Sequence, residues 1–261
     1  MEPIKVAVQG ASGKMGQEVV RAVYNDPGMR LCGAVEAQVS STSLALPDGS
    51  GTVPFSSDLE HIITTCRPDV LVDFTIAKAT MPAARIAARR HVNLVIGTTG
   101  FSPAELDEIK QLAAVNNIGA IMAPNFALGA VLMIHLAKIA SKYFDYAEII
   151  ELHHHKKADA PSGTANATAK AMAAARGKPF SNAGGNSPSR GQQVEGISLH
   201  SVRLPGLMAH QEVLLGTSGQ TLIVRHDTIN RECYMPGVLI AIREVVQRKG
   251  LIYGLDTLLG L

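Results

Sequence analysis

An apolar strand pattern runs directly into a glycine-rich turn in the stretch Ile4-Lys5-Val6-Ala7-Val8-Gln9-Gly10-Ala11-Ser12-Gly13-Lys14-Met15-Gly16. A helical pattern follows at residues 17–23, and strand, turn and helix in that order are the context of a dinucleotide-binding site. Gly10 suits a tight turn, Gly13 lets the backbone approach a pyrophosphate, and Gly16 allows the helix to pack closely on the strand. The spacing G-x-x-G-x-x-G is a variant of the commoner G-x-G-x-x-G, so the turn alone also fits a purely structural role.

A second apolar strand pattern supports the nucleotide interpretation. Residues 31–35 end in Glu36, about 20 residues beyond the last glycine, where an acid usually holds the ribose hydroxyls. Because strand, turn, helix, strand and acid follow one another in order, nucleotide binding is favoured over a plain turn.

Strand and helix patterns continue to alternate up to residue 126. They predict, in chain order, a surface loop at 40–51, a helix at 58–65, a strand at 70–74, a helix at 80–90, a strand at 93–96, a helix at 102–116 and a strand at 120–122. The last helix starts at Ser102-Pro103-Ala104-Glu105, which combines a cap, a first-turn proline and an acid. This alternation predicts an α/β fold with a Rossmann-like, doubly wound parallel sheet that helices cover on both faces.

Two further turns follow predicted strands, at Gly97-Thr98-Thr99-Gly100 and Ala123-Pro124-Asn125-Phe126. Ligands of such sheets bind beyond the carboxyl ends of the strands, which is where both turns lie. Ordinary loop chemistry explains each turn by itself. Because they share an edge with the glycine turn, contact with a cofactor is favoured.

The pattern changes beyond Phe126. It predicts helices at 128–144, 163–176 and 236–248, strands at 147–152, 196–203, 211–215 and 220–226, and a polar stretch at 181–187. The strands have an antiparallel character. We therefore expect a dinucleotide-binding domain at 1–125, to which 236–261 returns, and a second α+β domain at 126–235.

Composition narrows the class of protein. Of 261 residues, 46% are hydrophobic and 18% charged, and the formal net charge of +2 points to neither nucleic acid nor a membrane surface. Cys32, Cys66 and Cys233 form neither a C-x-x-C pair nor a disulfide framework, which suits a reducing compartment. Without a signal-peptide pattern or an apolar run of membrane-spanning length, we expect a cytoplasmic protein.

The most informative chemistry lies in the run Glu151-Leu152-His153-His154-His155-Lys156-Lys157-Ala158-Asp159-Ala160-Pro161-Ser162-Gly163-Thr164-Ala165. A metal site is disfavoured, because adjacent histidines on a strand face opposite ways and nothing completes a ligand set. A solvated polar loop explains the composition but not the helix start that follows at once. An acid–base and anion site explains both, and we favour it.

In that third interpretation, each residue type has a chemical task. Histidine titrates near neutral pH and can donate a proton during a reduction, and a nearby lysine can supply charge or a second proton. The N–H groups of Gly163 and Thr164, with the Thr164 hydroxyl, can hold a carboxylate at the helix start. The run therefore suits a small substrate that carries carboxylates.

The run E-L-H-H-H-K-K-A-D-A-P-S-G-T-A closely resembles the signature of the 4-hydroxy-tetrahydrodipicolinate reductases (dihydrodipicolinate reductases) of bacterial lysine and diaminopimelate synthesis. The turn G-A-S-G-K-M-G, the V-D-F-T at 72–75, the G-T-T-G at 97–100 and the P-N-F at 124–126 are similar to that family in the same order. The resemblance covers nearly the whole chain. It implies reduction of a cyclic imine dicarboxylate by NADH or NADPH with loss of water, in a homotetramer joined through the second domain's sheet.

The resemblance also implies residue roles. His153 would be the acid–base residue and Lys157 the proton donor. Substrate contacts would come from His154, Gly163 and Thr164. Cofactor contacts would come from Gly10, Ala11, Ser12, Gly13, Lys14, Met15, Glu36, Gly97, Thr98, Thr99, Ala123, Pro124, Asn125 and Phe126.

The sequence leaves alternatives open for the cofactor, NADH or NADPH, and for the class of function. Ala37 stands where some relatives carry an arginine suited to a 2′-phosphate, which argues for NADH, although Lys14 could still reach that phosphate. A non-catalytic nucleotide sensor would need no proton donors, so the histidine–lysine run argues against it. Another imine or amino-acid dehydrogenase on the same scaffold is the nearer alternative.

Overall fold

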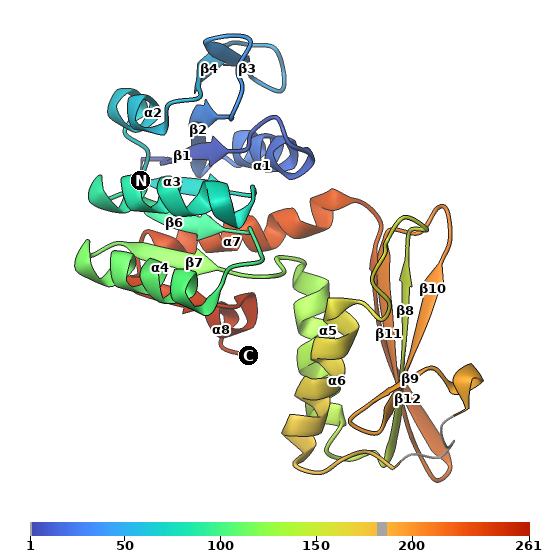
Figure 1. Ribbon diagram of the computed structural model, residues 1–261. Coiled ribbons are helices and arrows are strands. Elements are labelled where there is room, and N and C mark those ends of the chain that lie inside the picture. Colours follow the sequence, from blue (N-terminus) through green and yellow to red (C-terminus); the bar gives the residue numbers. More distant parts are fainter. Residues whose placement is uncertain (1, 182–186) are drawn as a thin grey trace. The chain divides into compact units, whose positions relative to one another are not determined.

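A computed structural model describes residues 2–181 and 187–261 of the chain (Figure 1). These residues divide into two compact units, one formed by residues up to Phe126 together with Tyr234–Leu261, and one formed by Ala127–Cys233. The chain passes between the units within two residues of the expected domain boundaries.

The first unit contains a mostly parallel sheet. Its strands are β1 (Ile4–Gln9), β2 (Met29–Val35), β3 (Ser43–Ala45), β4 (Thr52–Ser56), β5 (Val70–Asp73), β6 (Asn93–Ile96), β7 (Gly119–Met122) and β13 (Gly250–Tyr253). The strand order is β13-β7-β6-β5-β1-β2-β4-β3, and among the described strands of this sheet only the short β3–β4 pair is antiparallel. The chain thus builds outward from β1 in one direction and then, from β5, in the other, which confirms the doubly wound topology.

Helices cover the sheet and bury most residues of its central strands. The helices are α1 (Lys14–Asn25), α2 (Leu59–Cys66), α3 (Ala77–Arg89), α4 (Pro103–Val115), α7 (Met235–Val245) and α8 (Leu255–Leu259). Helices α2, α3 and α4 pack in a row, while α1 packs against α7 (Figure 1). Strands β5 and β7 expose none of their residues, as expected for parallel strands covered on both faces.

Two parts of this sheet differ from expectation. The predicted surface loop at 40–51 contains β3, whose Leu44 pairs with Val53 of β4, and the strand β13 and helix α8 follow the closing helix. Both regions carry weak signals. The edge hairpin is short and contains Pro54, and β13 is only a four-residue run that gains its stability from pairing with β7.

The second unit contains a mixed sheet with two helices along one face (Figure 1). Its elements are α5 (Leu128–Ala140), β8 (Tyr146–His153), α6 (Gly163–Arg176), β9 (Gln192–Val194), β10 (Ile197–Arg203), β11 (Ala209–Thr217) and β12 (Gln220–Thr228), in the strand order β12-β11-β8-β10-β9. The expected antiparallel character is wrong for one pair, because β10 runs parallel to β8. The chain between them crosses over through α6, and such a crossover brings two strands into parallel alignment.

Local signals for helix starts are confirmed. Asp58 and Ser162 each cap a helix with the side chain, and Ser102 forms a full capping box with Glu105. Helix α5 ends four residues earlier than predicted, at Ala140. The predicted polar stretch at 181–187 falls largely on residues 182–186, which lie outside the described residues. Across the described ranges, no helix has the length and apolar character needed to cross a bilayer.

Candidate active site

The glycine turn of the first unit has the close packing that the sequence suggested. Gly10 has a φ of +75°, in the left-handed region that favours glycine. A Cβ on Gly16 would lie 2.0 Å from the carbonyl oxygen of Gly10, so a larger residue would displace the turn. Gly16 therefore allows α1 to approach the turn itself, where we had expected it to face the strand.

The start of α1 is open to an anion. Within the described part of the chain, no side chain caps this helix start and its first turn carries no acid. Ser12, Gly13 and Lys14 are exposed there. The Glu36 carboxylate accepts hydrogen bonds of 3.0 Å from the backbone N–H groups of Ser12 and Ala37. The predicted ribose-binding acid thus lies against the predicted pyrophosphate turn.

A pocket of about 770 Å³ opens beside this turn, where the strand order reverses between β1 and β5. Gly10, Gly13 and Glu36 line it, together with Ala37 and Thr75. A largely apolar pocket with a glycine turn, and with Glu36 and Asp58 in its lining, matches what a dinucleotide needs. The residues present therefore fit a bound nicotinamide dinucleotide.

Asp73, at the end of β5, was not among the predicted site residues. Its Oδ1 accepts hydrogen bonds from the Thr75 N–H at 2.8 Å, the Thr75 hydroxyl at 2.7 Å and the Thr98 hydroxyl at 3.1 Å. Burial raises the pKa of this carboxyl, although the threonine hydrogen bonds oppose the shift. Asp73 thus joins the V-D-F-T turn to the G-T-T-G turn. A buried carboxylate directly after an apolar strand is the signal that could have identified it.

The remaining predicted cofactor residues lie at the carboxyl ends of β6 and β7. Among them the side chains of Thr98, Ala123 and Phe126 are buried, and the Phe126 ring packs against Phe74 with 5.6 Å between centroids. The Thr98 hydroxyl is already bonded to Asp73. The side chains of Thr99 and Pro124 are exposed and that of Asn125 is partly buried, so contact from these two turns to a cofactor would come from those side chains and from backbone groups.

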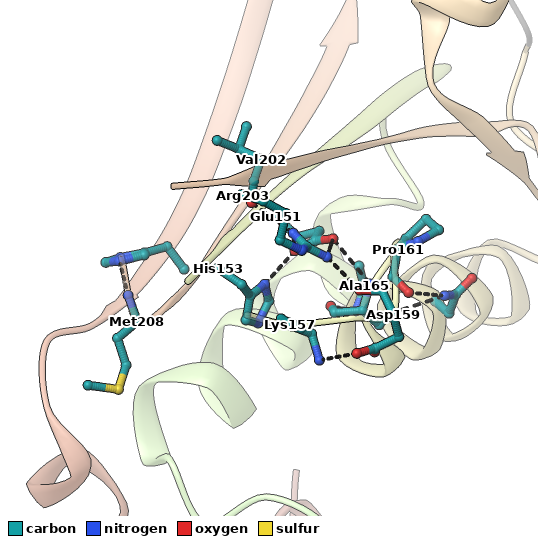
Figure 2. A network of polar contacts seen from close by, with 12 residues as sticks. Glu151, His153, Lys157, Asp159, Pro161, Ala165, Val202, Arg203 and Met208 are labelled. Carbon is teal, nitrogen blue, oxygen red and sulfur yellow. Dashed lines mark hydrogen bonds and ion pairs between the residues drawn. The ribbon is translucent and has the colours of Figure 1, made fainter. Parts of the chain in front are cut away.

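A buried charge cluster occupies the end of β8 in the second unit (Figure 2). The fully buried Glu151 carboxylate accepts two hydrogen bonds from Arg203, Nη1 to Oε2 at 2.9 Å and Nη2 to Oε1 at 2.7 Å. It also accepts from the Ser162 backbone N–H at 3.2 Å and is hydrogen-bonded to Nδ1 of His153. A buried carboxylate needs such partners, because an unpaired charge there is very costly.

This cluster decides which nitrogen of His153 is available. Burial favours the neutral Glu151, but hydrogen bonds led by Arg203 outweigh it and hold the pKa of this carboxyl below its usual range. Burial lowers the pKa of His153, and the opposing pull of Glu151 does not cancel that shift. Because an ionised carboxylate only accepts, Nδ1 carries the proton of the neutral ring and Nε2 is left to exchange one.

The same cluster reaches Lys157 through Asp159 (Figure 2). Nη2 of Arg203 donates to the Asp159 carbonyl oxygen at 2.7 Å, and Nζ of Lys157 lies 2.8 Å from Oδ1 of Asp159. The Lys157 N–H also donates to the carbonyl oxygen of His154 at 3.1 Å, while the His154 side chain is exposed. One network of contacts therefore connects the two predicted catalytic side chains.

The start of α6 adjoins this network through Ser162. The Ser162 hydroxyl accepts from the Ala165 N–H at 3.1 Å, which leaves the Gly163 and Thr164 N–H groups at the first helical turn. Gly163 is exposed, and a Cβ placed there would meet nothing within 4 Å. Of the predicted substrate residues, Gly163 and Thr164 thus form an accessible helix start that can receive a carboxylate.

Sequence reasoning had missed Glu151, Arg203 and Ser162 as parts of this site. Glu151 precedes His153 by two residues on a strand, so both side chains lie on one face, and that spacing was the available signal. Among the described residues, no group of His, Cys, Asp or Glu is arranged to hold a metal ion.

Comparison with known proteins gives one consistent result. Family models described as dihydrodipicolinate reductase, N-terminus and C-terminus, match residues 4–126 and 129–259. A protein named 4-hydroxy-tetrahydrodipicolinate reductase from Dehalococcoides mccartyi is 58% identical over the full length of both chains. One of the same name from Moorella thermoacetica is 46% identical over 98% of each chain. A dipicolinate-bound dihydrodipicolinate reductase from Paenisporosarcina is 42% identical, with a TM-score of 0.86 over 97% of this chain and 98% of its own.

Proposed function

This chain belongs to the dihydrodipicolinate reductase family, and we propose that the cluster around Glu151, His153 and Lys157 carries its proton chemistry. The enzyme is an NAD(P)H-dependent oxidoreductase of lysine and diaminopimelate biosynthesis. It reduces 4-hydroxy-tetrahydrodipicolinate to tetrahydrodipicolinate: one hydride and one proton enter, and one water leaves. The observation that supports the residue assignment is the shared network that holds His153, Lys157 and the start of α6.

The second unit binds the substrate's carboxylates. A carboxylate at the start of α6 receives hydrogen bonds from the N–H groups of Gly163 and Thr164, and the Thr164 hydroxyl lies on the same turn. His154 contacts the substrate from the end of β8. In support, the solved relative from Paenisporosarcina holds dipicolinate, a cyclic dicarboxylate.

Two side chains handle protons. Lys157 donates the proton that accompanies the hydride, and its ion pair with Asp159 holds its ammonium group in place. His153 exchanges a proton with the substrate through Nε2, because Nδ1 is bonded to Glu151. Arg203 and Glu151 keep the ring in that orientation.

The first unit holds the cofactor. When bound, the reduced nicotinamide supplies the hydride. The turn from Gly10 to Met15 and the start of α1 bind the pyrophosphate, and Glu36 binds the ribose hydroxyls. The turns at 97–99 and 123–126 contact the cofactor through the side chains of Thr99, Pro124 and Asn125 and through backbone groups.

We further propose a homotetramer located in the cytoplasm. The face of the second unit's sheet opposite α5 and α6 carries Ile150, Leu214 and Ile223 on three adjacent strands, with Ile223 52% exposed. Glu148, Glu212 and Arg225 lie on the same face, so this mixed face suits a contact with further copies of the chain that combines apolar packing with ion pairs. Three free, half-buried cysteines suit a reducing compartment.

The test is oxidation of NADH and of NADPH, separately, with freshly made product of dihydrodipicolinate synthase as substrate. Lys157→Ala and His153→Ala should each lower kcat by about 10²- to 10⁴-fold, the usual contribution of a positioned acid or base. Lys156→Ala and His155→Ala, at exposed neighbours in the same run, should retain wild-type rates.

Each outcome separates a different part of the proposal. Equal losses in all four variants would contradict the assignment of donors. Cofactor binding without turnover by the wild type would contradict the reaction and favour another imine or amino-acid dehydrogenase.

A further inference from the structure

Strand β8 carries two clusters of the same composition in different surroundings. Glu148 pairs with Arg190 and His200, and Glu151 pairs with Arg203 and His153. The Glu148 side chain is 36% exposed, whereas that of Glu151 is fully buried. An exposed ion pair contributes little to stability, and a buried one loses in desolvation much of what its attraction supplies. Net stability is therefore a poor reason for the buried cluster.

The contacts of the buried cluster reach every part of the proposed substrate site. Glu151 is bonded to His153, at the end of β8, and to the Ser162 N–H, which immediately precedes the open start of α6. Arg203 donates to Glu151 from the neighbouring strand β10, where it lies in register with His153. The same guanidinium donates to the carbonyl oxygen of Asp159, whose side chain holds Lys157.

We propose that the Glu151–Arg203 pair is a positioning device, which orients the His153 ring and fixes the Lys157 loop and the α6 start around one substrate. This inference rests on the proposed function, because it concerns how the groups named there are held. Glu151 and Arg203 contact other protein groups and act through them.

For His153 the pair has two separable consequences. It selects the tautomer with the proton on Nδ1, so that Nε2 is the exchanging atom. It also influences the pKa of the His153 ring through the charges around that ring. Glu151 raises the pKa of His153, whereas burial and the charges of Lys157 and Arg203 lower it. Loss of the Glu151 charge should therefore lower the pKa of His153 further, and the protonated ring should require more acidic solution.

The kinetic test compares Glu151→Gln with Glu148→Gln, its counterpart on the same strand. Glu151→Gln should reduce kcat/KM by about 10- to 100-fold, as loss of a partner that orients a functional histidine does elsewhere. The limb of the pH–rate profile that reports His153 is the one that disappears in His153→Ala. In Glu151→Gln this limb should move to lower pH. Glu148→Gln should leave both the rate and that limb unchanged.

A wild-type rate and an unmoved limb in a folded Glu151→Gln would overturn the inference. An inactive wild type would instead contradict the proposed function, so the two failures are distinguishable. An equal loss of kcat/KM in Glu151→Gln and Glu148→Gln would also overturn the inference about the Glu151–Arg203 pair.

A measurement on the wild type does not depend on any variant folding. Nitrogen-15 NMR of labelled enzyme, with His153 assigned by comparison with His153→Gln, should show the neutral ring protonated at Nδ1. A ring protonated at Nε2, or one averaged over both tautomers, would overturn the inference. Arg203→Lys keeps the positive charge but loses the two-pronged contact with Glu151. In this variant the His153 ring should therefore show some averaging between the two tautomers.

Discussion

Glu151 and His153 show how one buried carboxylate can fix the chemistry of a neighbouring ring. The carboxylate is ionised because Arg203, His153 and a backbone N–H all donate to it. The ring is neutral near neutral pH because burial lowers its pKa. The protonation of the proposed proton-exchanging ring is thus set by neighbouring protein groups.

Both groups predict a loss of stability in acid. The folded-state pKa of Glu151 lies below its usual value, so its contribution is present above the usual carboxyl range and is lost as the pH falls through the folded-state pKa. The pKa of His153 is also lowered, so the unfolded chain binds a proton first once the pH falls below the usual imidazole range.

Urea titration measures this effect. Between about pH 7 and about pH 5, the free energy of unfolding of the wild type should fall by on the order of 1 kcal/mol more than that of His153→Gln. Parallel slopes for the two proteins would contradict the lowered pKa of His153.

Residue 37 gives a second prediction at this scale. Ala37→Arg places a guanidinium beside Glu36, where it can pair with a 2′-phosphate. The kcat/KM ratio of NADPH to NADH should rise by about tenfold, and Ala37→Gln serves as the uncharged control. An unchanged ratio in Ala37→Arg would place the adenosine ribose away from Glu36.

Single residues also mark the limits of sequence reasoning. The run itself indicated histidine and lysine as proton donors, because that chemistry is carried by their own side chains, and the family resemblance assigned the roles to His153 and Lys157. Arg203 could not be predicted in this way, since its link to Glu151 depends on the β8–β10 register across about 50 residues of chain. The role of Asp73 could not be predicted either, because it depends on the hydrogen bond from Thr98, which lies in the turn after the next strand.

The two termini of helix α6 have different roles. Its start at Ser162 and Gly163 leaves N–H groups for a carboxylate, and its end at Gly177 takes a left-handed φ of +74°. The first feature concerns binding and the second concerns only how the helix stops.

Two substitutions separate these roles. A Cβ at position 163 would meet nothing within 4 Å, so Gly163→Val should not affect folding. Its side chain should screen the helix start from the substrate carboxylate. KM should then rise about tenfold, as expected for the loss of one hydrogen bond to a charged group. Gly177→Ala should cost about 1–2 kcal/mol of stability through its left-handed backbone and leave KM unchanged. Steady-state kinetics and thermal unfolding of both variants check this, and the reverse pattern would contradict it.

At the scale of elements, the sequence predicted what depends on local signals. Helix-start signals such as that at Ser102, together with hydrophobic periodicity, placed most helices and strands. The parallel pairing of β8 with β10 was missed because it depends on the crossover through α6. Strand β13 was missed because its pairing partner β7 lies about 130 residues earlier in the chain, a contact that local signals do not reveal.

At the scale of the whole molecule, the account predicts self-association through one sheet face. Leu214 lies opposite Ile223 on β12, and Ile150 lies on the same face of β8. Leu214→Asp should convert the proposed tetramer to smaller species in light scattering, because a charge would be buried at the contact. Leu136→Asp, at an exposed position of α5, should keep the wild-type mass. Dissociation by the second variant alone would place the contact elsewhere.

The chain reduces 4-hydroxy-tetrahydrodipicolinate with a hydride from its cofactor, and isotope labelling follows that hydride. Mass spectrometry would be applied to the product formed with NADH deuterated at the transferred position of nicotinamide C4. We expect one deuterium on a ring carbon of tetrahydrodipicolinate, one water lost and one cofactor oxidised per product. Cofactor oxidation without deuterium in that product, or no oxidation at all, would contradict this reaction.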